Sequence, residues 1–470
     1  MGAAEVRHLN GSDLPEAPCE AIQGSQIQRC LLCRHSPRIC LERGSFRREK
    51  CQKGEKSMKL LWLCNNAPGL IRTALTGKKA GEVNWVDHVL SDLRQQDVTL
   101  RILYRGGGEP GQLDEECSYA PVPETPAHIY RPELAEAFQK ELEAYRPEVI
   151  HIWGVEYHHA LAMVNAAAQA GMLDRTVASI QGLCCRIAPH FTDGLPNSAL
   201  SPQTLRDFLR GDSIANQQHV HAQRGELEIQ ALQTLRHVIG RTDWDRKTAL
   251  EINPNLTYHF CNETLRKPFY EGRWSYETCE KHSIFASSCA YPIKGFHLLL
   301  EAMPEILKQY PDAKIRVCGR SFLTSGLRQN GYEKYLAKLA KKSHLTDKIT
   351  CLGPLSAQQM KENYRKANVF VLPSTMENSP NSLGEAMLLG TPCVAANVGG
   401  VASILDPEEG VLCPPVSPEA LAEGICRVFA LEDRAADLGE KARAHAQVTH
   451  DPKTNLETLL AIYRQLSEGA

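Results

Sequence analysis

Two glutamates in the second half of this 470-residue chain stand where a binding site would be expected. The apolar run Val369–Pro373 predicts a buried strand, and Glu377 and Glu385 follow it, eight positions apart. A polar loop and a helix after such a strand make half of a βαβ unit. Ligands of these units bind outside the carboxyl ends of the strands. We therefore expect Glu377 to lie at the edge of a ligand site.

The helix that carries Glu385 has clear sequence boundaries. Ser379 suits the N-cap and Pro380 suits the first helical position. Gly390, followed by Pro392, is typical of the far end of a helix. The helix is therefore predicted to begin within a few residues of Glu377.

The start of this helix favours phosphate. Backbone amides at Asn381 and Ser382 would have no partner inside the helix, and such amides attract anions. Glu385 lies further along and can only accept hydrogen bonds, as from neutral hydroxyls. Phosphate beside hydroxyls indicates a nucleotide sugar. The alternative is structural, because carboxylates near a helix start are favoured by the helix dipole alone.

Further motifs follow in register with the two glutamates. They are Glu385-Ala386-Met387, Gly390-Thr391-Pro392, the strand Val394-Ala395-Ala396 and the loop Gly399-Gly400. The whole pattern resembles the retaining glycosyltransferases of family 4 (glycosyl transferases group 1), whose fold is GT-B. The resemblance runs from about Met58 to the end of the chain and is strongest in the C-terminal half.

The resemblance implies a donor site in the C-terminal half of the chain. Glu377 and Lys294 are the expected catalytic residues: Glu377 would bind hydroxyls of the donor sugar, and Lys294 would pair with the diphosphate. Glu385 would bind the ribose. The remaining donor-binding candidates are Asn381, Ser382, Leu383, Arg241, Arg320 and Gly353.

Two positions depart from the family pattern. Cys289 stands where relatives usually carry an arginine, five residues before Lys294, so Arg241 or Arg320 would have to supply the missing cation. Gln181 stands where many relatives have a histidine, and glutamine cannot act as a general base.

Polar residues also follow the run Val149–Trp153. Glu156 and His158, together with Gln181 at the end of the predicted strand Thr176–Ile180, are candidates for contact with the acceptor or the donor sugar. For Glu156 and His158 the alternative is an ordinary polar helix start.

The chemistry needs a group that carries the charge of the departing diphosphate. A metal can do this, and so can cations and amide dipoles. The resemblance implies the second route, and the sequence offers no convincing Asp-x-Asp metal pair. We therefore expect no metal and no cofactor, with a nucleoside diphosphate sugar as substrate. Cys30, Cys33, Cys40 and Cys51 leave a zinc site as an alternative outside the donor domain.

Composition agrees with a globular enzyme. The chain has 53 Lys and Arg against 55 Asp and Glu, and this near-neutral balance gives no indication of nucleic-acid binding. No apolar run approaches the length of a membrane span. We expect a cytoplasmic protein, either free or peripherally associated with the inner face of the membrane if its acceptor is lipid-linked. The sequence does not determine the oligomeric state.

The predicted elements form two α/β series. From Met58 strands and helices alternate, which predicts a mostly parallel, doubly wound sheet, and a second series begins near Ser283. The fold class is therefore α/β, GT-B, with two Rossmann-like domains facing a cleft.

The expected parts of the chain are a disordered or non-native extension over residues 1–57, an acceptor domain over 58–262, a linker over 263–282, a nucleotide-sugar domain over 283–448 and a helix over 449–470 that crosses back to the first domain.

One stretch, residues 181–217, shows no period and is expected to be a long loop, either a binding loop for the acceptor or a plain variable loop. The predicted activity is transfer of a sugar to a glycan or another hydroxyl acceptor, in polysaccharide or glycoconjugate synthesis. The alternatives are a GT-B nucleotide-sugar epimerase, and a non-catalytic GT-B subunit that binds glycan.

Overall fold

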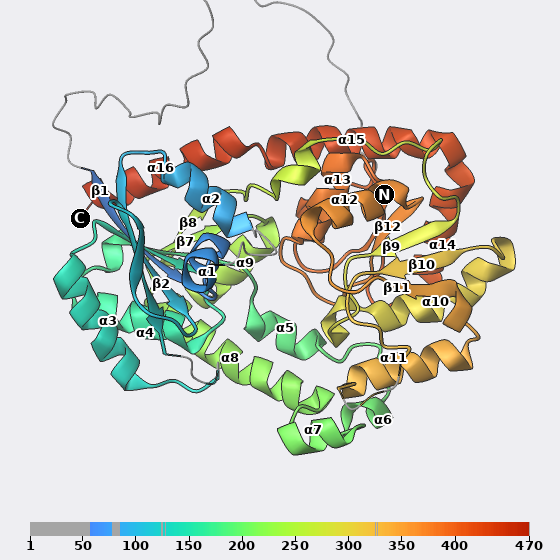
Figure 1. Cartoon of the computed structure of the whole chain (residues 1–470), viewed down its shortest axis with the longest axis horizontal. Coiled ribbons are helices and arrows are strands. Elements are labelled where there is room, and N and C mark those ends of the chain that lie inside the picture. The colour runs from blue at the N-terminus through green and yellow to red at the C-terminus, as the bar shows by residue number, and fades with distance from the viewer. Residues whose placement is uncertain are drawn as a thin grey trace, which may run out of the picture. The chain divides into compact units, whose positions relative to one another are not determined.

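The computed structural model of the protein describes residues 57–77, 85–123, 126, 128–324, 326 and 328–469. Two sheets, each with helices around it, make up this part of the chain (Figure 1). The expectations for the first 56 residues, including the zinc alternative, lie outside the described residues.

The first sheet has the strand order β3-β4-β2-β1-β5-β6-β7-β8, and all neighbours are parallel except β3 and β4. Its central strands β5 and β6 are buried along their whole length, as expected where helices cover both faces. The strands are β1 (Met58–Cys64), β2 (Val98–Arg105), β3 (Gly111–Asp114), β4 (Cys117–Val122), β5 (Val149–Trp153), β6 (Thr176–Ser179), β7 (His237–Gly240) and β8 (Thr257–Phe260).

The helices of this half follow the strands in the chain. They are α1 (Gly69–Thr76), α2 (Trp85–Leu93), α3 (Pro132–Tyr145), α4 (His158–Gln169), η1 (Leu173–Arg175), α5 (Cys184–His190), α6 (Asn197–Leu200), α7 (Leu205–Arg210), α8 (Ile214–Thr234) and α9 (Asp243–Ile252). The 3-10 turn η2 (Lys267–Tyr270) lies in the connection to the second sheet.

The second sheet is entirely parallel, in the order β11-β10-β9-β12-β13-β14. Its strands are β9 (Ser283–Ala286), β10 (Lys314–Val317), β11 (Ile349–Cys351), β12 (Val369–Leu372), β13 (Cys393–Ala396) and β14 (Val411–Cys413). Its helical elements are η3 (Pro292–Lys294), α10 (Phe296–Gln309), α11 (Gly331–Lys342), η4 (Thr346–Lys348), α12 (Ala357–Lys366), α13 (Asn381–Leu389), η5 (Val401–Ser403), α14 (Pro418–Leu431), η6 (Glu432–Arg434) and α15 (Ala435–Thr449).

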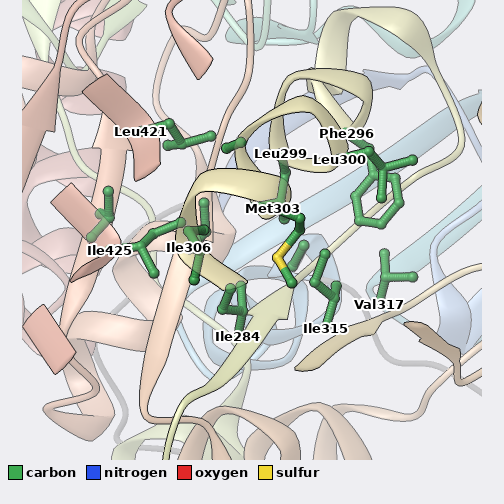
Figure 2. Close-up of a cluster of buried hydrophobic side chains, with 14 of the residues drawn as sticks. Ile284, Phe296, Leu299, Leu300, Met303, Ile306, Ile315, Val317, Leu421 and Ile425 are labelled. Atoms are coloured by element: carbon green, nitrogen blue, oxygen red, sulfur yellow. The ribbon is translucent and has the colours of Figure 1, made fainter. Parts of the chain in front are cut away.

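A dense apolar core supports one face of the second sheet. Side chains from β9, β10, α10 and α14 interlock there, as Figure 2 shows for Ile284, Met303, Ile306, Ile315 and Ile425. All five are fully buried. Burial of such side chains is the main stabilising term in folding. It also gives the neighbouring loops a rigid base.

The last helix, α16 (Pro452–Glu468), returns to the first sheet and packs against β5 and α2 (Figure 1). Its Tyr463 is fully buried and bonds two side chains of that sheet. The Trp62 Nε1–H group donates to Tyr463 Oη over 3.1 Å, and His151 Nδ1 lies 2.6 Å from the same oxygen.

The structure corrects the expectation for residues 181–217. This stretch is not a long loop but contains α5, α6, α7 and the start of α8. The first three are only 7, 4 and 6 residues long, so none spans enough turns to show a helical period. The long α8 begins at Ile214, and the side chain of its N-cap residue Ser213 accepts from the Asn216 amide.

Other predicted boundaries differ by a few residues, and four short strands were not predicted. The helix after β12 begins at Asn381 with Pro380 as its N-cap, one position later than expected from Ser379. The missed strands are β3, β4, β8 and β14, each at or near a sheet edge. None of the helices in the described ranges is both long and apolar enough to cross a membrane.

Candidate functional site

A pocket of about 630 Å³ opens where the carboxyl ends of strands from both sheets meet. From the second sheet it receives the loops after β9 and β12 and the start of α13. From the first sheet it receives the residues that follow β6 and β7. Its lining residues are Arg72, Gln181, Arg241, Leu265, Arg266, Ser287, Lys294, Met360, Glu377, Ser379, Pro380, Asn381, Ser382 and Glu385.

Lys294 and Glu377 meet directly in this pocket. The Lys294 Nζ atom donates to Glu377 Oε1 over 2.6 Å, and Ser374 Oγ donates to the same oxygen over 2.7 Å. The Glu377 side chain is 10 % exposed and that of Lys294 is 35 % exposed, so the ammonium faces the open space. Since an ammonium group has three N–H donors, Lys294 can hold Glu377 and an anion together.

Two tight turns place this pair. Gly295 and Gly399 both have positive φ, of 64° and 53°. A Cβ atom on Gly295 would lie 1.8 Å from the Pro373 carbonyl oxygen, and one on Gly399 would lie 1.9 Å from the Glu377 carbonyl oxygen. Only glycine permits both the conformation and these approaches.

The start of α13 faces the same pocket. No side chain caps this helix, and its first internal bond is from the Leu383 N–H group to the Pro380 carbonyl oxygen, over 2.9 Å. The amides of Asn381 and Ser382 come before that bond. They are therefore in the position where helices bind anions. Leu383, also expected to bind the donor, is not in the pocket lining: its amide bonds within the helix and its side chain is fully buried.

Glu385 is held by an arginine that was not predicted from the sequence. Arg266 Nε donates to Glu385 Oε1 over 2.7 Å, and Arg266 Nη2 donates to Oε2 over 2.9 Å. Tyr364 Oη lies 3.4 Å from Oε2. The Glu385 side chain is only 4 % exposed. Glu385, which the sequence predicts to bind ribose, is thus already part of a buried ion pair at the pocket wall. Its carboxylate can still accept further hydrogen bonds.

Glu263 connects the two halves of the pocket. Its carboxylate accepts from Gln181 Nε2 at 2.7 Å and Asn381 Nδ2 at 3.2 Å, and it pairs with Arg241 Nη1 at 2.6 Å. The side chains of Glu263 and Arg241 are 7 % and 5 % exposed. His450 Nδ1 lies 2.8 Å from the Glu263 carbonyl oxygen. Glu263 therefore orients three pocket residues at once.

A second link joins the halves beside this one. Asn378 Nδ2 donates to the Ile180 carbonyl oxygen over 3.3 Å, and Thr242 Oγ1 donates to Asn378 Oδ1 over 3.1 Å. All these groups are buried. The loop between Glu377 and α13 is thus tied to the strand ends of the first sheet.

Two predicted donor ligands lie elsewhere. Arg320 is not in the pocket lining, and its guanidinium binds Glu333 of α11, with Nη2 2.6 Å from Oε1 and 2.7 Å from Oε2. Gly353 forms two backbone bonds with Gly319, of 3.0 Å and 3.1 Å, and is also outside the lining. Of the two arginines considered for the missing cation, Arg241 reaches the pocket and Arg320 does not.

The polar residues after β5 form a separate buried cluster. Asn65 Nδ2 donates to Glu156 Oε1 over 2.9 Å, and His159 Nε2 lies 2.8 Å from Asn65 Oδ1. Burial raises the pKa of Glu156 to about 7, and its Oε2 atom has no partner among the described residues. Glu156 and His158 do not line the pocket, so the structure separates them from Gln181.

Asp243 and Asp245 have Asp-x-Asp spacing, but both lie in the first turn of α9. Asp245 Oδ2 accepts from the Arg241 amide at 3.0 Å, and Tyr258 Oη lies 2.5 Å from its Oδ1. Thr242 and Asp245 form a capping box on α9. In the described part of the chain no three His, Cys, Asp or Glu residues are grouped as a metal site would require.

Three features of the pocket had weak sequence signals or none. Arg266 and Glu263 lie in the irregular, polar and aromatic connection between the sheets, where no period marks a functional position. Arg72 of α1 belongs to the pocket lining but precedes the other lining residues by more than 100 positions. Their roles follow only from which strand ends meet in space.

The fold is GT-B, and this expectation is confirmed by solved structures. The chain superposes on sucrose-phosphate synthase from Thermosynechococcus elongatus with a TM-score of 0.65, 19 % identity and coverage of 88 % of this chain and 100 % of that one. Anabaena HepE, in a complex with UDP and glucose, gives a TM-score of 0.60, 15 % identity, and 86 % and 99 % coverage.

Sequence comparison identifies relatives of the second half of the chain. Residues 277–445 match the family model described as glycosyl transferases group 1. The D-inositol 3-phosphate glycosyltransferase of Corynebacterium urealyticum is 29 % identical over 177 residues, which is 37 % of this chain and 41 % of the relative. An uncharacterised glycosyltransferase of Methanocaldococcus jannaschii is 32 % identical over 151 residues, or 32 % and 36 % of the two chains. The matches thus span about two fifths of these curated relatives.

Proposed function

We propose that this protein is a retaining glycosyltransferase of family 4 that moves a sugar from a nucleoside diphosphate sugar to a hydroxyl acceptor. The observation that carries the proposal is the pocket in which Lys294, Glu377 and the uncapped start of α13 converge. These three features place a cation, a carboxylate that can accept hydrogen bonds from sugar hydroxyls, and free backbone amides in one pocket. The match of residues 277–445 to the group 1 model supports the same assignment.

In this proposal the diphosphate of the donor lies between Lys294 and the amides of Asn381 and Ser382. Lys294 donates to Glu377 and retains N–H groups for a phosphate oxygen. Such preorganised donors stabilise the charge that develops on the leaving group. Arg241 and Arg266 also line the pocket, each paired with a buried glutamate. These groups are sufficient for a route that does not require a metal.

Glu377 is proposed to bind hydroxyls of the transferred sugar. Ser374 and Lys294 both donate to its Oε1, which fixes the carboxylate and leaves Oε2 for the substrate. Glu385 is proposed to accept from ribose hydroxyls while Arg266 neutralises its buried charge. In the retaining reaction the departing phosphate takes the proton of the acceptor hydroxyl, so no protein base is required.

The first half of the molecule is proposed to bind the acceptor, a glycan or a lipid-linked glycan, in polysaccharide or glycoconjugate synthesis. Arg72, Gln181 and Arg241 are its contributions to the pocket. For the donor, UDP-glucose is the first candidate, because the structural neighbour HepE has been crystallised with UDP-glucose.

The test is a calorimetric and hydrolysis screen of the full chain against a panel of nucleotide sugars, with UDP-glucose first. We expect one of them to bind and to be slowly hydrolysed. Substituting Glu377→Gln should reduce turnover by about 100-fold with little change in nucleotide affinity. Lys294→Ala should weaken binding of the free nucleoside diphosphate, and Lys308→Ala, at an exposed position on α10, is the matched control.

The same screen separates the alternatives. If no nucleotide or nucleotide sugar binds, the protein is a non-catalytic GT-B subunit. If a donor is converted to its epimer without any acceptor, the protein is an epimerase. Unchanged kinetics in both Glu377→Gln and Lys294→Ala would contradict the site itself.

A further inference from the structure

The short helix α7 presents its apolar face to solvent. Leu205, Phe208 and Leu209 are 69 %, 73 % and 72 % exposed. Their i, i+3, i+4 spacing places them on one side of the helix. We call these three residues the α7 apolar patch. Grouped large apolar side chains on a protein surface usually mark an interaction site.

The opposite side of α7 holds the helix in this orientation. Asp207 is fully buried, and its carboxylate accepts from the backbone amides of Gln203, Thr204 and Gly331, over 3.0 Å, 3.1 Å and 3.1 Å. Thr204 and Asp207 also form a capping box. Turning the apolar patch inward would break these bonds and leave a buried carboxylate without partners. Exposure of the patch is therefore built into the fold.

Basic side chains adjoin the patch. Gly331, which bonds Asp207, is the first residue of α11, and this helix carries the exposed residues Lys338, Lys341 and Lys342. Figure 1 shows α6, α7 and α11 together at one edge of the molecule. Lys338 and Lys342 also line a depression of about 660 Å³ beside α6.

Two of the nearby acidic groups are paired with arginines, and a third, Glu301, lines the same depression as Lys338 and Lys342. Asp212 pairs with Arg206 over 2.7 Å, and Glu333 pairs with Arg320. The surface formed by α7 and α11 therefore combines three exposed apolar side chains with three exposed lysines.

We propose that this surface docks on an anionic lipid membrane. The α7 apolar patch would insert at the boundary between headgroups and acyl chains, and the lysines of α11 would remain among the phosphates. A stable protein partner would need about 800 Å² and 20 to 30 residues on each side. Three side chains on one turn are too few for that, but they are sufficient for a shallow insertion assisted by charge. This inference goes beyond the proposed function and does not depend on it.

The test is sedimentation of the full chain with vesicles of phosphatidylcholine alone or with about 30 % phosphatidylglycerol. We expect binding to the anionic vesicles and its loss at high salt. Replacing all three patch residues by glutamine (Leu205→Gln, Phe208→Gln and Leu209→Gln together) should lower the bound-to-free ratio about tenfold or more. Replacing Lys338, Lys341 and Lys342 by glutamine should lower it about fivefold per lysine.

Val448→Gln is the matched control, because Val448 is 75 % exposed but lies on α15. It should bind vesicles like the wild type. Thermal melts establish whether the variants are folded. If the triple variant does not fold, the single variant Phe208→Gln and the lysine variants test the proposal instead. The proposal is overturned if anionic vesicles do not bind the protein, or if the patch variants bind as well as the control. It is also overturned if the patch instead mediates self-association that these variants abolish in gel filtration.

Discussion

At the scale of single residues, the pocket depends on carboxylates that are buried and already bonded. Glu263 holds Gln181, Asn381 and Arg241. With Arg241 it forms a buried ion pair, in which Arg241 Nη1 lies 2.6 Å from Glu263 Oε2. Removing one member of a buried ion pair leaves an uncompensated charge, which costs more than the pair contributes. Glu263 is therefore a positioning residue for the pocket, because it acts through the side chains that it holds.

Glu263→Ala is expected to reduce the free energy of unfolding by about 3–5 kcal/mol, since it strands Arg241. Donor turnover should fall as well, because Gln181 and Asn381 lose their common partner. Denaturant melts and initial rates measure the two effects. Glu263→Asp keeps the negative charge opposite Arg241 and should restore part of the stability. A pure packing role for Glu263 would instead leave turnover of the folded variant unchanged.

The control for this substitution is Glu271→Ala, at an exposed position in the same connection between the sheets. A solvated carboxylate contributes little, so its stability should remain within about 0.5 kcal/mol of the wild type. Equal losses at Glu263 and Glu271 would contradict the assigned role.

At the scale of elements, the loop Gly399-Gly400 positions the loop that carries Glu377. The Gly400 amide donates to the Glu377 carbonyl oxygen over 3.1 Å. A Cβ on Gly400 would lie 2.2 Å from the Asn378 carbonyl oxygen. The two backbones therefore touch without room for a methyl group. Contact with the Gly399-Gly400 loop after β13 thus helps to hold the loop that carries Glu377.

Gly399→Ala is expected to reduce turnover at least about tenfold, because it must push the Glu377 carbonyl away from a distance of 1.9 Å. Initial rates and thermal melts would measure the change. Gly171→Ala is the matched control: Gly171 has a similar φ of 67°, but no atom lies within 4 Å of its Cβ position. It should lose only about 1–2 kcal/mol of stability from left-handed strain, with kinetics unchanged. Normal turnover in Gly399→Ala would show that this contact does not position Glu377.

At the scale of the whole described molecule, α16 joins the end of the chain to the first sheet. His151 lies between Tyr463 Oη of α16 and Ser179 Oγ of β6, at 2.6 Å and 2.7 Å. Burial lowers the pKa of His151 to about 3 from its ordinary 6.5. Protonation of this histidine would add a positive charge to a sealed apolar interface.

The sign of the pH dependence follows from that shift. Between pH 6.5 and pH 3 the unfolded chain binds a proton at His151 that the folded protein does not bind. The stability from His151 is thus complete above pH 6.5 and is lost as the pH falls. Between about pH 7.5 and about pH 5 this one group should remove about 2 kcal/mol.

The measurement is the difference in unfolding free energy between those two pH values, for the wild type and for His151→Gln. The difference should shrink by about 2 kcal/mol in the variant. His219→Gln, at an exposed position on α8, should leave it unchanged. An identical pH dependence in His151→Gln and the wild type would refute the role of this interface.

Much of the fold and part of the site could be predicted from the sequence for local reasons. The buried strand β12, the glycine turns and the helix of Glu385 are encoded within short windows, and Lys294, Glu377, Asn381 and Ser382 do line one pocket. The stretch that contains α5, α6 and α7 was mistaken for a loop because helices of so few residues show no period.

What the sequence determined by itself was the local arrangement: two parallel α/β halves, a carboxylate after a strand, and the start of a helix close behind it. The tertiary structure alone decided which distant groups complete it. Arg266 pairs with Glu385, and Glu263 with Arg241, across 119 and 22 positions of the chain. Arg241 and Glu263 follow the paired strands β7 and β8, and Arg266 of the connection between the sheets meets Glu385 of α13. Such pairs form only when elements that are separate in the chain pack together, so no short window of sequence can specify them.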